Sequence, residues 1–391
     1  MDFNLTEEER AFREEVRAFL RRELTPEIWE QHRDHNEQGM WSPEFTKVFR
    51  RKLGAAGYIG MGWPKEWGGG GRSRMFQAIL WDEMEYHRAP GIDRSVTYVP
   101  NAVMTFGTPE QKAALLPKMT LGELSWFVGY SEPEAGSDLA NIKTKAVEDG
   151  DDYIITGQKS FSSDSHMADY CWMATRTDPN SVKHAGLSMF IVDMTLPGIT
   201  IAKHPTLAGW THHSVNFDHV RVPKSMLVGE LHQGWKVIMG AIDFERAALS
   251  SSGLVTYQMD RLLSLCASDT QVPGTMLDDD VVCDKLVGLA IEAEAAKLGV
   301  YWLASMHARG LRPQHETSTA LLIKRETSRL LDEVGMEMLG PYAPLRAGSA
   351  HAALAGEVEL EYRDHLYFQF AAGGFDITRN VIAQRGLGLP R

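Results

Sequence analysis

The chain has 391 residues, 43% of them hydrophobic and 24% charged, and a net charge of −12. This length exceeds what one ordinary hydrophobic core serves, so we expect two or three packed units. The acidic balance argues against nucleic acid or an anionic membrane surface as the main partner. Three widely separated cysteines predict neither a disulfide framework nor a zinc site. The polar N-terminus and the lack of a long uncharged run predict a cytoplasmic protein with no signal peptide and no membrane span.

Helical periodicity dominates the first third of the chain. Thr6 and Glu9 fit a capping box, and an apolar stripe follows them at Phe12, Val16, Phe19 and Leu20. Further helices are expected after Ser42, across 76–87 and across 109–121, with a break at the glycine-rich "WPKEWGGGG". The region 1–122 therefore reads as an all-helical domain.

The period changes to that of strands from about residue 123. Short runs rich in aromatic and β-branched residues, such as "SWFVGY", "YCWMATR" and "LSMFIVD", are separated by Gly, Asp, Asn and Pro. Residues 123–230 are thus expected to form an antiparallel β domain. Long helical patterns across 283–307 and 323–338 then predict a helical bundle at 231–391. The fold class is α+β, in the order helical, β, helical.

Two segments of the β region carry groups suited to a ligand. "YSEPEAGSD" ends a strand in a loop whose backbone N–H groups and hydroxyls could face a polar ligand edge, although a surface turn is the alternative. "GQKSFSSDSHMADY" places Phe161 beside Ser162 and Ser163. A planar cofactor could stack on this ring, and a half-buried strand aromatic is the alternative.

These two segments, with "FIVDMTLPGITI", "VNFDHVRVPKSMLVGELHQGW" and "GGFDITRNVIAQRGLGLPR", stand in the order and spacing of the acyl-CoA dehydrogenase family. The resemblance covers nearly the whole chain. It implies FAD as cofactor, an acyl-CoA thioester as substrate, electron-transfer flavoprotein as electron acceptor and the same helical, β, helical order.

The resemblance also implies the binding residues. Positions that line the flavin ring in the family are matched here by Val128, Tyr130, Ser131, Phe161 and Ser163. Phe161 stands where the family usually has Trp, a change that keeps stacking and loses an indole N–H. Ser137 matches a position near the cofactor and CoA pyrophosphates. Ser137 and Arg246 are the predicted substrate contacts.

The catalytic base of most relatives is missing, because Ala372 stands where they carry a glutamate. Other branches place the base on the first long helix of the C-terminal bundle, where Glu245 matches it. Ile238, Ala241, Ile242 and Leu249 form an apolar stripe around Glu245, an unusual place for a carboxylate. The alternatives are a structural carboxylate paired with an arginine at Glu245, or Asp376 as the base. The resemblance leaves the backbone N–H of Ala372 as a donor to the thioester carbonyl.

An Arg-x-x-Phe-Gly segment that reaches a neighbour's FAD in homo-oligomeric relatives is absent from "LCASDTQVPGTMLDDDVVCDKL". A later Gln is replaced by Glu337 and a Gly by Pro341. This pattern is most similar to the helix-glutamate subunit of heterotetrameric steroid side-chain acyl-CoA dehydrogenases. It implies a related partner chain; a homotetramer or homodimer is the alternative.

Two other readings of function remain open from the sequence, a non-catalytic partner subunit and an acyl-CoA oxidase. The histidines of "HRDH" and "THH" lack acidic or cysteine partners at metal spacing, so we expect surface or packing histidines and no metal site.

Overall fold

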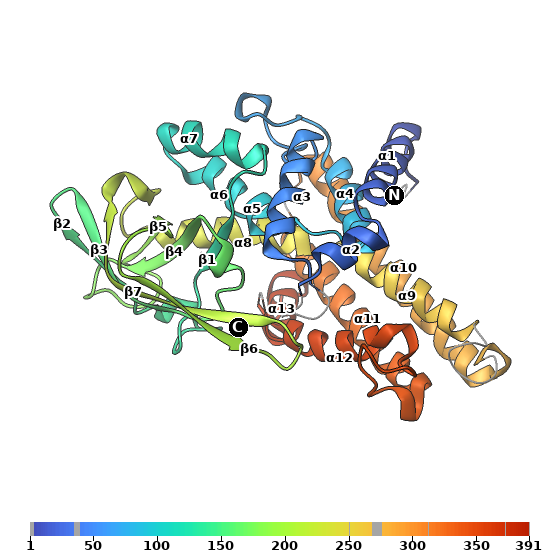
Figure 1. The fold of residues 1–391 in the computed structure, drawn as a ribbon. Coiled ribbons are helices and arrows are strands. Elements are labelled where there is room, and N and C mark those ends of the chain that lie inside the picture. Colours follow the sequence, from blue (N-terminus) through green and yellow to red (C-terminus); the bar gives the residue numbers. More distant parts are fainter. Residues whose placement is uncertain are drawn as a thin grey trace.

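The computed structural model describes residues 4–34, 40–249, 251–267, 276–311, 313–371 and 373–390, without the side chains of 243–249 and of residue 368. Figure 1 shows helices, a β domain and a second set of helices in chain order, which confirms the predicted architecture. None of the helices in these ranges is both long and apolar enough to cross a bilayer.

The first helix begins at the cap that the sequence predicts. The hydroxyl of Thr6 accepts a hydrogen bond from the backbone N–H of Glu9 at 3.2 Å, and the Glu9 carboxylate accepts one from the backbone N–H of Thr6 at 2.8 Å. The predicted stripe on α1 is buried. The helices of this part are α1 (Glu7–Glu23), α2 (Pro26–His32), α3 (Pro43–Ala55), α4 (Arg74–Tyr86), α5 (Arg94–Thr97), α6 (Val99–Phe106) and α7 (Pro109–Thr120).

The β domain is one sheet in the order β6-β7-β3-β2-β4-β5-β8, with β1 paired to β4. Pairing is antiparallel except that β4 runs parallel to both β1 and β2, while β4 and β5 are antiparallel. The strands are β1 (Trp126–Gly129), β2 (Lys145–Asp149), β3 (Asp152–Lys159), β4 (Tyr170–Arg176), β5 (Leu187–Asp193), β6 (Ile199–Pro205), β7 (Thr211–Pro223) and β8 (Leu227–Val228).

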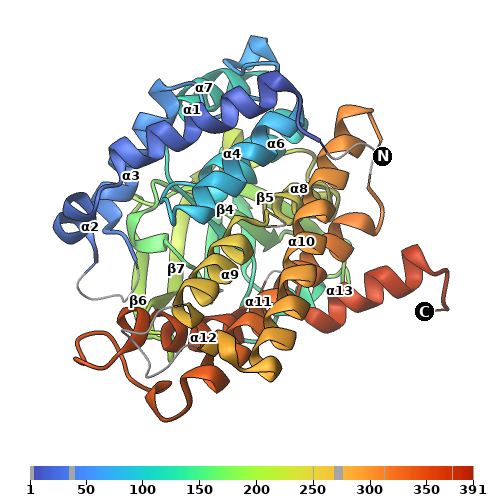
Figure 2. The same cartoon turned by 90° about the vertical axis from the view of Figure 1, so that its right-hand side faces the viewer.

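The C-terminal helices pack beside both earlier parts. In Figure 2 the end of the chain, from α13 onward, extends away from the bundle. The helices are α8 (Gly234–Leu249), α9 (Gly253–Cys266), α10 (Asp280–Ala308), α11 (Glu316–Leu339), α12 (Glu357–Phe368) and α13 (Phe375–Val381), which continues into a π-helical turn at Ile382–Gly386.

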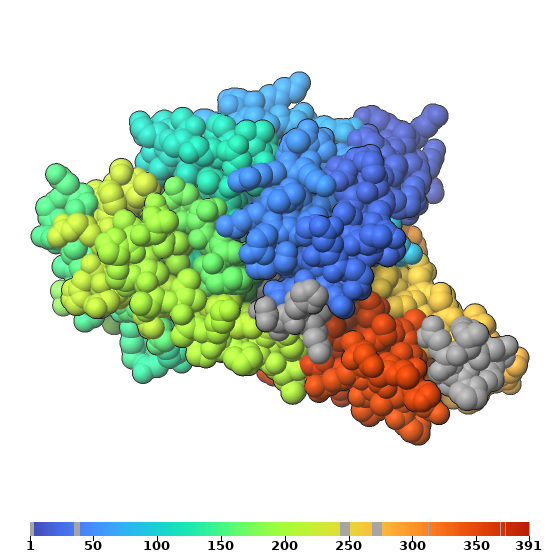
Figure 3. All heavy atoms as spheres, viewed as in Figure 1, coloured from blue at the N-terminus to red at the C-terminus, as the bar shows by residue number. Residues whose placement is uncertain are grey.

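One hydrophobic core joins the three parts. Trp126 and Trp172 of the sheet share it with Val99 of α6 and with Ile238 and Ala241 of α8. The space-filling view shows the blue, green and orange-red segments meeting as one continuous surface (Figure 3). The loops that follow β1 and β3 are therefore held against helices at this junction.

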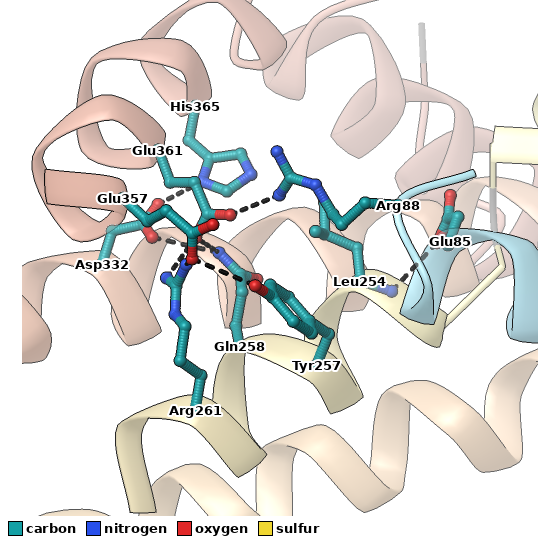
Figure 4. A network of polar contacts seen from close by, with 10 residues as sticks. All are labelled: Glu85, Arg88, Leu254, Tyr257, Gln258, Arg261, Asp332, Glu357, Glu361 and His365. Carbon is teal, nitrogen blue, oxygen red and sulfur yellow. Dashed lines mark hydrogen bonds and ion pairs between the residues drawn. The ribbon is translucent and has the colours of Figure 1, made fainter. Parts of the chain in front are cut away.

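A buried ionic network ties the N-terminal part to the bundle (Figure 4). Arg88, just after α4, pairs with Glu361 of α12, and Arg261 of α9 donates to Glu361 at 2.6 Å. In the same cluster, His365 of α12 pairs with Asp332 of α11. The two halves of the helical structure thus share charges that neither could bury alone.

Candidate functional site

The end of β1 places two of the predicted flavin-lining residues. Val128 lies opposite Trp172 in the parallel β1–β4 register and is half-buried. The indole Nε1 of Trp172 donates to the hydroxyl of Tyr130 at 3.1 Å, and that hydroxyl is also hydrogen-bonded to the hydroxyl of Tyr98. The Tyr130 side chain is consequently fixed by one residue from the sheet and one from the helices.

The loop after Tyr130 is fastened by a buried carboxylate. Glu132 accepts hydrogen bonds from the backbone N–H groups of Lys143 at 2.7 Å and Thr144 at 3.0 Å, and from Nζ of Lys159 at 2.7 Å. The carbonyl of Ser131 accepts from the backbone N–H of Ser160 at 2.8 Å. The loops after β1 and β3 are therefore joined to each other directly. Ser137, further along the first loop, is exposed.

Lys159 has no exposed surface, and burial lowers the pKa of its ammonium despite the neighbouring Glu132. Burial alone would raise the pKa of Glu132, but Lys159 and the hydrogen bonds hold it below its usual range. This pair could not be predicted from the sequence, because Lys159 stands at the end of a strand with ordinary alternation of apolar and polar residues. Its structural effect is to set the path of the two loops that carry the predicted flavin contacts.

Phe161 and Ser163 lie side by side at the tip of the second loop. Phe161 has a φ of +53°, an unusual conformation for an aromatic residue, and its side chain is 66% exposed. Ser163 is half-buried next to it. A bare aromatic face in a strained loop beside a hydroxyl suits the face and polar edge of a planar ring, so the residues fit a flavin.

His212 of β7 lies behind this loop. Its Nδ1 is 3.1 Å from the Ser163 hydroxyl, and its ring meets Phe161 edge-on with centroids 5.6 Å apart. Trp210 and Tyr367 contact the same imidazole. Burial lowers the pKa of His212 to about 4, so the ring is neutral at pH 7. His213 is likewise buried, and both are packing histidines; the described residues contain no cluster able to hold a metal ion.

The predicted catalytic groups lie outside the residues and side chains that the structure describes. Glu245 and Arg246 belong to α8, but their side chains lie outside the described residues, as does Ala372. The chain on either side of position 372 is anchored. Arg325 of α11 donates to the carbonyl of Ala371 at 3.1 Å, and the Thr378 hydroxyl donates to the carbonyl of Gly373 at 2.7 Å.

The alternative base, Asp376, is a surface acid whose side chain is almost fully exposed and 3.9 Å from Arg379. A carboxylate in full contact with water does not have the water-excluded surroundings expected of this base. Near the predicted partner contacts, Glu337 is exposed and pairs with Lys285 at 2.5 Å. Asp279 caps α10 by accepting from the backbone N–H of Val281 at 2.8 Å.

A separate cleft of about 650 Å³ lies between the α2–α3 region and the β6–β7 hairpin. It is lined on one side by Arg33 and Glu44 and on the other by Lys203, His166 and His213. None of the predicted cofactor residues lines it. His212 and His213 alternate along β7, so the cleft lies on the opposite face of that strand from Ser163.

Family models match the chain in three consecutive pieces: the acyl-CoA dehydrogenase N-terminal domain at 6–123, the middle domain at 128–220 and the C-terminal domain at 232–387. The chain belongs to the acyl-CoA dehydrogenase family. Members of this family are flavoprotein oxidoreductases that normally bind FAD, and the exposed ring of Phe161 beside Ser163 fits that cofactor.

Full-length relatives include two proteins of Mycobacterium tuberculosis. Acyl-CoA dehydrogenase FadE26 is 35% identical, with 100% of this chain and 99% of the relative covered, and FadE29 is 32% identical with the same coverage. Among solved structures, the Tcur3481-Tcur3483 steroid acyl-CoA dehydrogenase matches with a TM-score of 0.91 and 31% identity. The ChsE4-ChsE5 complex from M. tuberculosis matches with a TM-score of 0.90 and 34% identity. Both structural matches cover 100% of each chain.

Proposed function

We propose that the chain is an FAD-dependent acyl-CoA dehydrogenase subunit that forms an α,β double bond in an acyl-CoA thioester. The observation that carries the proposal is the exposed Phe161 beside Ser163, on a loop tied to the Tyr130 loop, in a chain of this family. Bound FAD would accept the hydride that leaves the β-carbon of the substrate. Val128, Tyr130, Ser131, Phe161 and Ser163 would hold its ring, and Ser137 would contact the cofactor and CoA pyrophosphates.

Glu245 is the proposed base, which removes the α-proton of the thioester. The first half of α8 buries Val237, Ile238 and Ala241 in the core shared by the three parts of the fold. Position 245 follows Ala241 by four residues and Ile238 by seven, which is the spacing of one helical face. A carboxylate on that face would lose water and gain the raised pKa that proton abstraction from a thioester requires.

The backbone N–H of Ala372 is the proposed donor to the thioester carbonyl, and Arg246 the proposed contact to the CoA part. Arg325 and Thr378 hold the carbonyls of residues 371 and 373 on either side of this position, which supports the proposal. A donor fixed in advance stabilises the enolate charge that develops when the α-proton leaves.

Glu245→Gln tests the base. We expect anaerobic bleaching of the flavin by an acyl-CoA to slow by about 10²–10⁴-fold, the usual contribution of a positioned base. Asp243→Asn is the matched control and should bleach at the wild-type rate. Unchanged bleaching in the Glu245 variant would rule out this residue as the base.

The proposed substrate is a bulky acyl-CoA of the steroid side-chain type, and the proposed partner is a second, related dehydrogenase chain. Support comes from the Tcur3481-Tcur3483 steroid enzyme and the ChsE4-ChsE5 complex, whose chains match over their full length. In this chain α10 exposes Val281, Val287 and Ile291 on one face, an apolar surface that a second subunit would cover.

FAD occupancy tests the partner. The chain purified alone should bind FAD poorly, and co-expression with a related dehydrogenase that carries Arg-x-x-Phe-Gly should raise occupancy toward one FAD per pair of chains. Full occupancy in a homo-oligomer of this chain would contradict the heteromeric assembly and leave the dehydrogenase proposal standing.

A further inference from the structure

His212 is paired with Ser163 but has no functional role among those proposed so far. Ser163 is a predicted flavin contact, whereas His212 belongs to a strand behind the loop and is 5% exposed. The 3.1 Å separation of Nδ1 and Oγ is hydrogen-bonding distance. The imidazole packs against Trp210, at a centroid distance of 4.4 Å, and against Tyr367, at 5.0 Å, and these two rings also contact each other. It therefore cannot turn away without disturbing the contact between β7 and α12.

The direction of this hydrogen bond follows from the other ring nitrogen. Nε2 of His212 is buried and has no hydrogen-bond partner among the described residues. A neutral ring can carry its proton on either nitrogen. A proton on Nε2 would leave a bare buried N–H, whereas a proton on Nδ1 leaves only an unused lone pair, and unpaired buried donors are the rarer of the two. The Nδ1–H form is thus favoured, and it donates to Ser163.

We propose that His212 is a positioning residue for the flavin: it donates a hydrogen bond from Nδ1 to Ser163 and so leaves the hydroxyl proton of Ser163 free to donate to an acceptor on the flavin ring. A hydroxyl has one proton and two lone pairs, so a partner that occupies a lone pair directs the proton elsewhere. The oxidised ring offers nitrogen and carbonyl oxygen acceptors that this proton could meet.

This inference rests on the proposed FAD site. Contacts of the loop that would hold the flavin ring support the role of His212 without reference to activity. Phe161 contacts the His212 ring edge-on, so the same imidazole also supports the exposed aromatic face. The loop backbone is fixed to β7 as well, because the N–H of Ser162 donates to the carbonyl of His213 at 2.8 Å. His212 then controls the direction of the Ser163 hydroxyl at the loop tip.

Four variants and one spectrum test the proposal. His212→Leu should weaken FAD binding to the full chain, with its partner chain present where that is needed for occupancy, by about 5-fold, the size of one net hydrogen bond. His212→Asn places an amide where Nδ1 was and should restore most of the affinity. His212→Gln extends past that point and should not. Ser163→Ala should weaken binding at least as much as His212→Leu, because it removes the hydroxyl that His212 positions.

The ¹⁵N spectrum of histidine-labelled chain without FAD reports the proton directly. The resonances lost in His212→Asn should be those of a neutral ring protonated at Nδ1 at pH 7. A ring protonated at Nε2, wild-type affinity in His212→Leu, or equal affinities of the Asn and Gln variants would each overturn the proposal. A wild-type protein that binds no FAD with or without its partner would instead overturn the proposed function, while the spectrum would still decide the tautomer.

Discussion

Arg261 of α9 donates to the buried carboxylate of Glu361 on α12 across 2.6 Å, and Arg88 reaches the same carboxylate from the N-terminal part of the chain. Gln258 donates to it as well, at 3.2 Å. Burial alone would raise the pKa of Glu361, but the two guanidinium groups hold it below its usual range. A carboxylate this well paired stays charged in the interior, and its partners depend on it in turn.

Removing one partner of Glu361 should therefore lower the free energy of unfolding. Arg261→Met leaves Glu357 without its guanidinium, and it leaves Glu361 with one guanidinium, that of Arg88, beside the amide of Gln258. We expect a loss of about 3–5 kcal/mol in the free energy of unfolding, the usual effect of breaking a buried pair. Equilibrium denaturation in urea measures it. Arg329→Met removes half-exposed pairs with Glu326 and Glu333 and should cost below about 1 kcal/mol. Equal losses in the two variants would show that the network adds little.

The pair of His365 and Asp332 should make stability depend on pH. Burial raises the pKa of Asp332 to about 6. Burial would lower the pKa of His365, but Asp332, Glu361 and Asp364 around it raise it above its usual range. Both groups hold protons more tightly in the folded state than in the unfolded chain. Their contribution is complete at low pH, begins to fall above about pH 4 for Asp332, and is lost for His365 as pH rises through its raised pKa.

His365→Asn should flatten this dependence. The difference in melting temperature between wild type and variant should be largest below about pH 6.5 and should shrink toward pH 9. His351→Asn, at an exposed position, is the control and should leave the profile unchanged. A difference that grows with rising pH would contradict the sign of the raised pKa.

Strong local signals in the sequence predicted the long elements correctly. The capping box at Thr6 and the stripe that follows gave α1, and the patterns across 76–87 and 109–121 gave α4 and α7. The short helices α5 and α6 were missed because they span only Arg94–Thr97 and Val99–Phe106, too few residues for a period to appear. The parallel pairing of β1 with β4 was missed as well, since register between distant strands leaves no local trace.

Buried charged residues were harder to predict from the sequence. On α11 the apolar residues Ile323 and Val334 of the periodic pattern across 323–338 are half-buried, whereas Lys324 and Asp332 of the same helix are buried. Their burial depends on Glu85 and His365, more than thirty residues away in the sequence. Hydrophobic periodicity cannot reveal such residues, because a charged residue in the pattern predicts an exposed position. The pair of Lys159 and Glu132 escaped prediction for the same reason.

Lys159→Met should therefore affect both stability and cofactor binding. It leaves Glu132 buried with only two backbone donors, and we expect a loss of about 3–5 kcal/mol. Because Glu132 fixes the loop that carries Ser131 and Ser137, FAD affinity should fall as well. Urea denaturation and flavin titration measure the two effects. Lys143→Met breaks the exposed pair with Glu134 and should change stability by less than about 1 kcal/mol. If the Lys159→Met protein is destabilised but binds FAD with wild-type affinity, the Lys159–Glu132 pair stabilises the fold without contributing to the FAD site.

The junction of α4 and α9 should reject any side chain at Gly253. A Cβ built there would lie 1.8 Å from the carbonyl oxygen of Asp82 and 2.7 Å from the backbone nitrogen of Tyr86. Both obstacles are backbone atoms of α4, which cannot move as a flexible side chain would. The neighbouring N–H of Ser252 donates to the Asp82 carboxylate at 2.7 Å, so separating the helices would also strain that bond.

Gly253→Ala should thus lower the free energy of unfolding by about 1–3 kcal/mol, the range for overpacking, in spite of the better helix propensity of alanine. Gly288→Ala is the matched control in the interior of α10, where a Cβ meets nothing within 4 Å. That variant should gain about 0.5–1 kcal/mol, since alanine replaces glycine in a helix without a clash. Urea denaturation of the two variants gives opposite signs if α4 and α9 are as close as described, and a stabilised Gly253→Ala protein would mean that they are further apart.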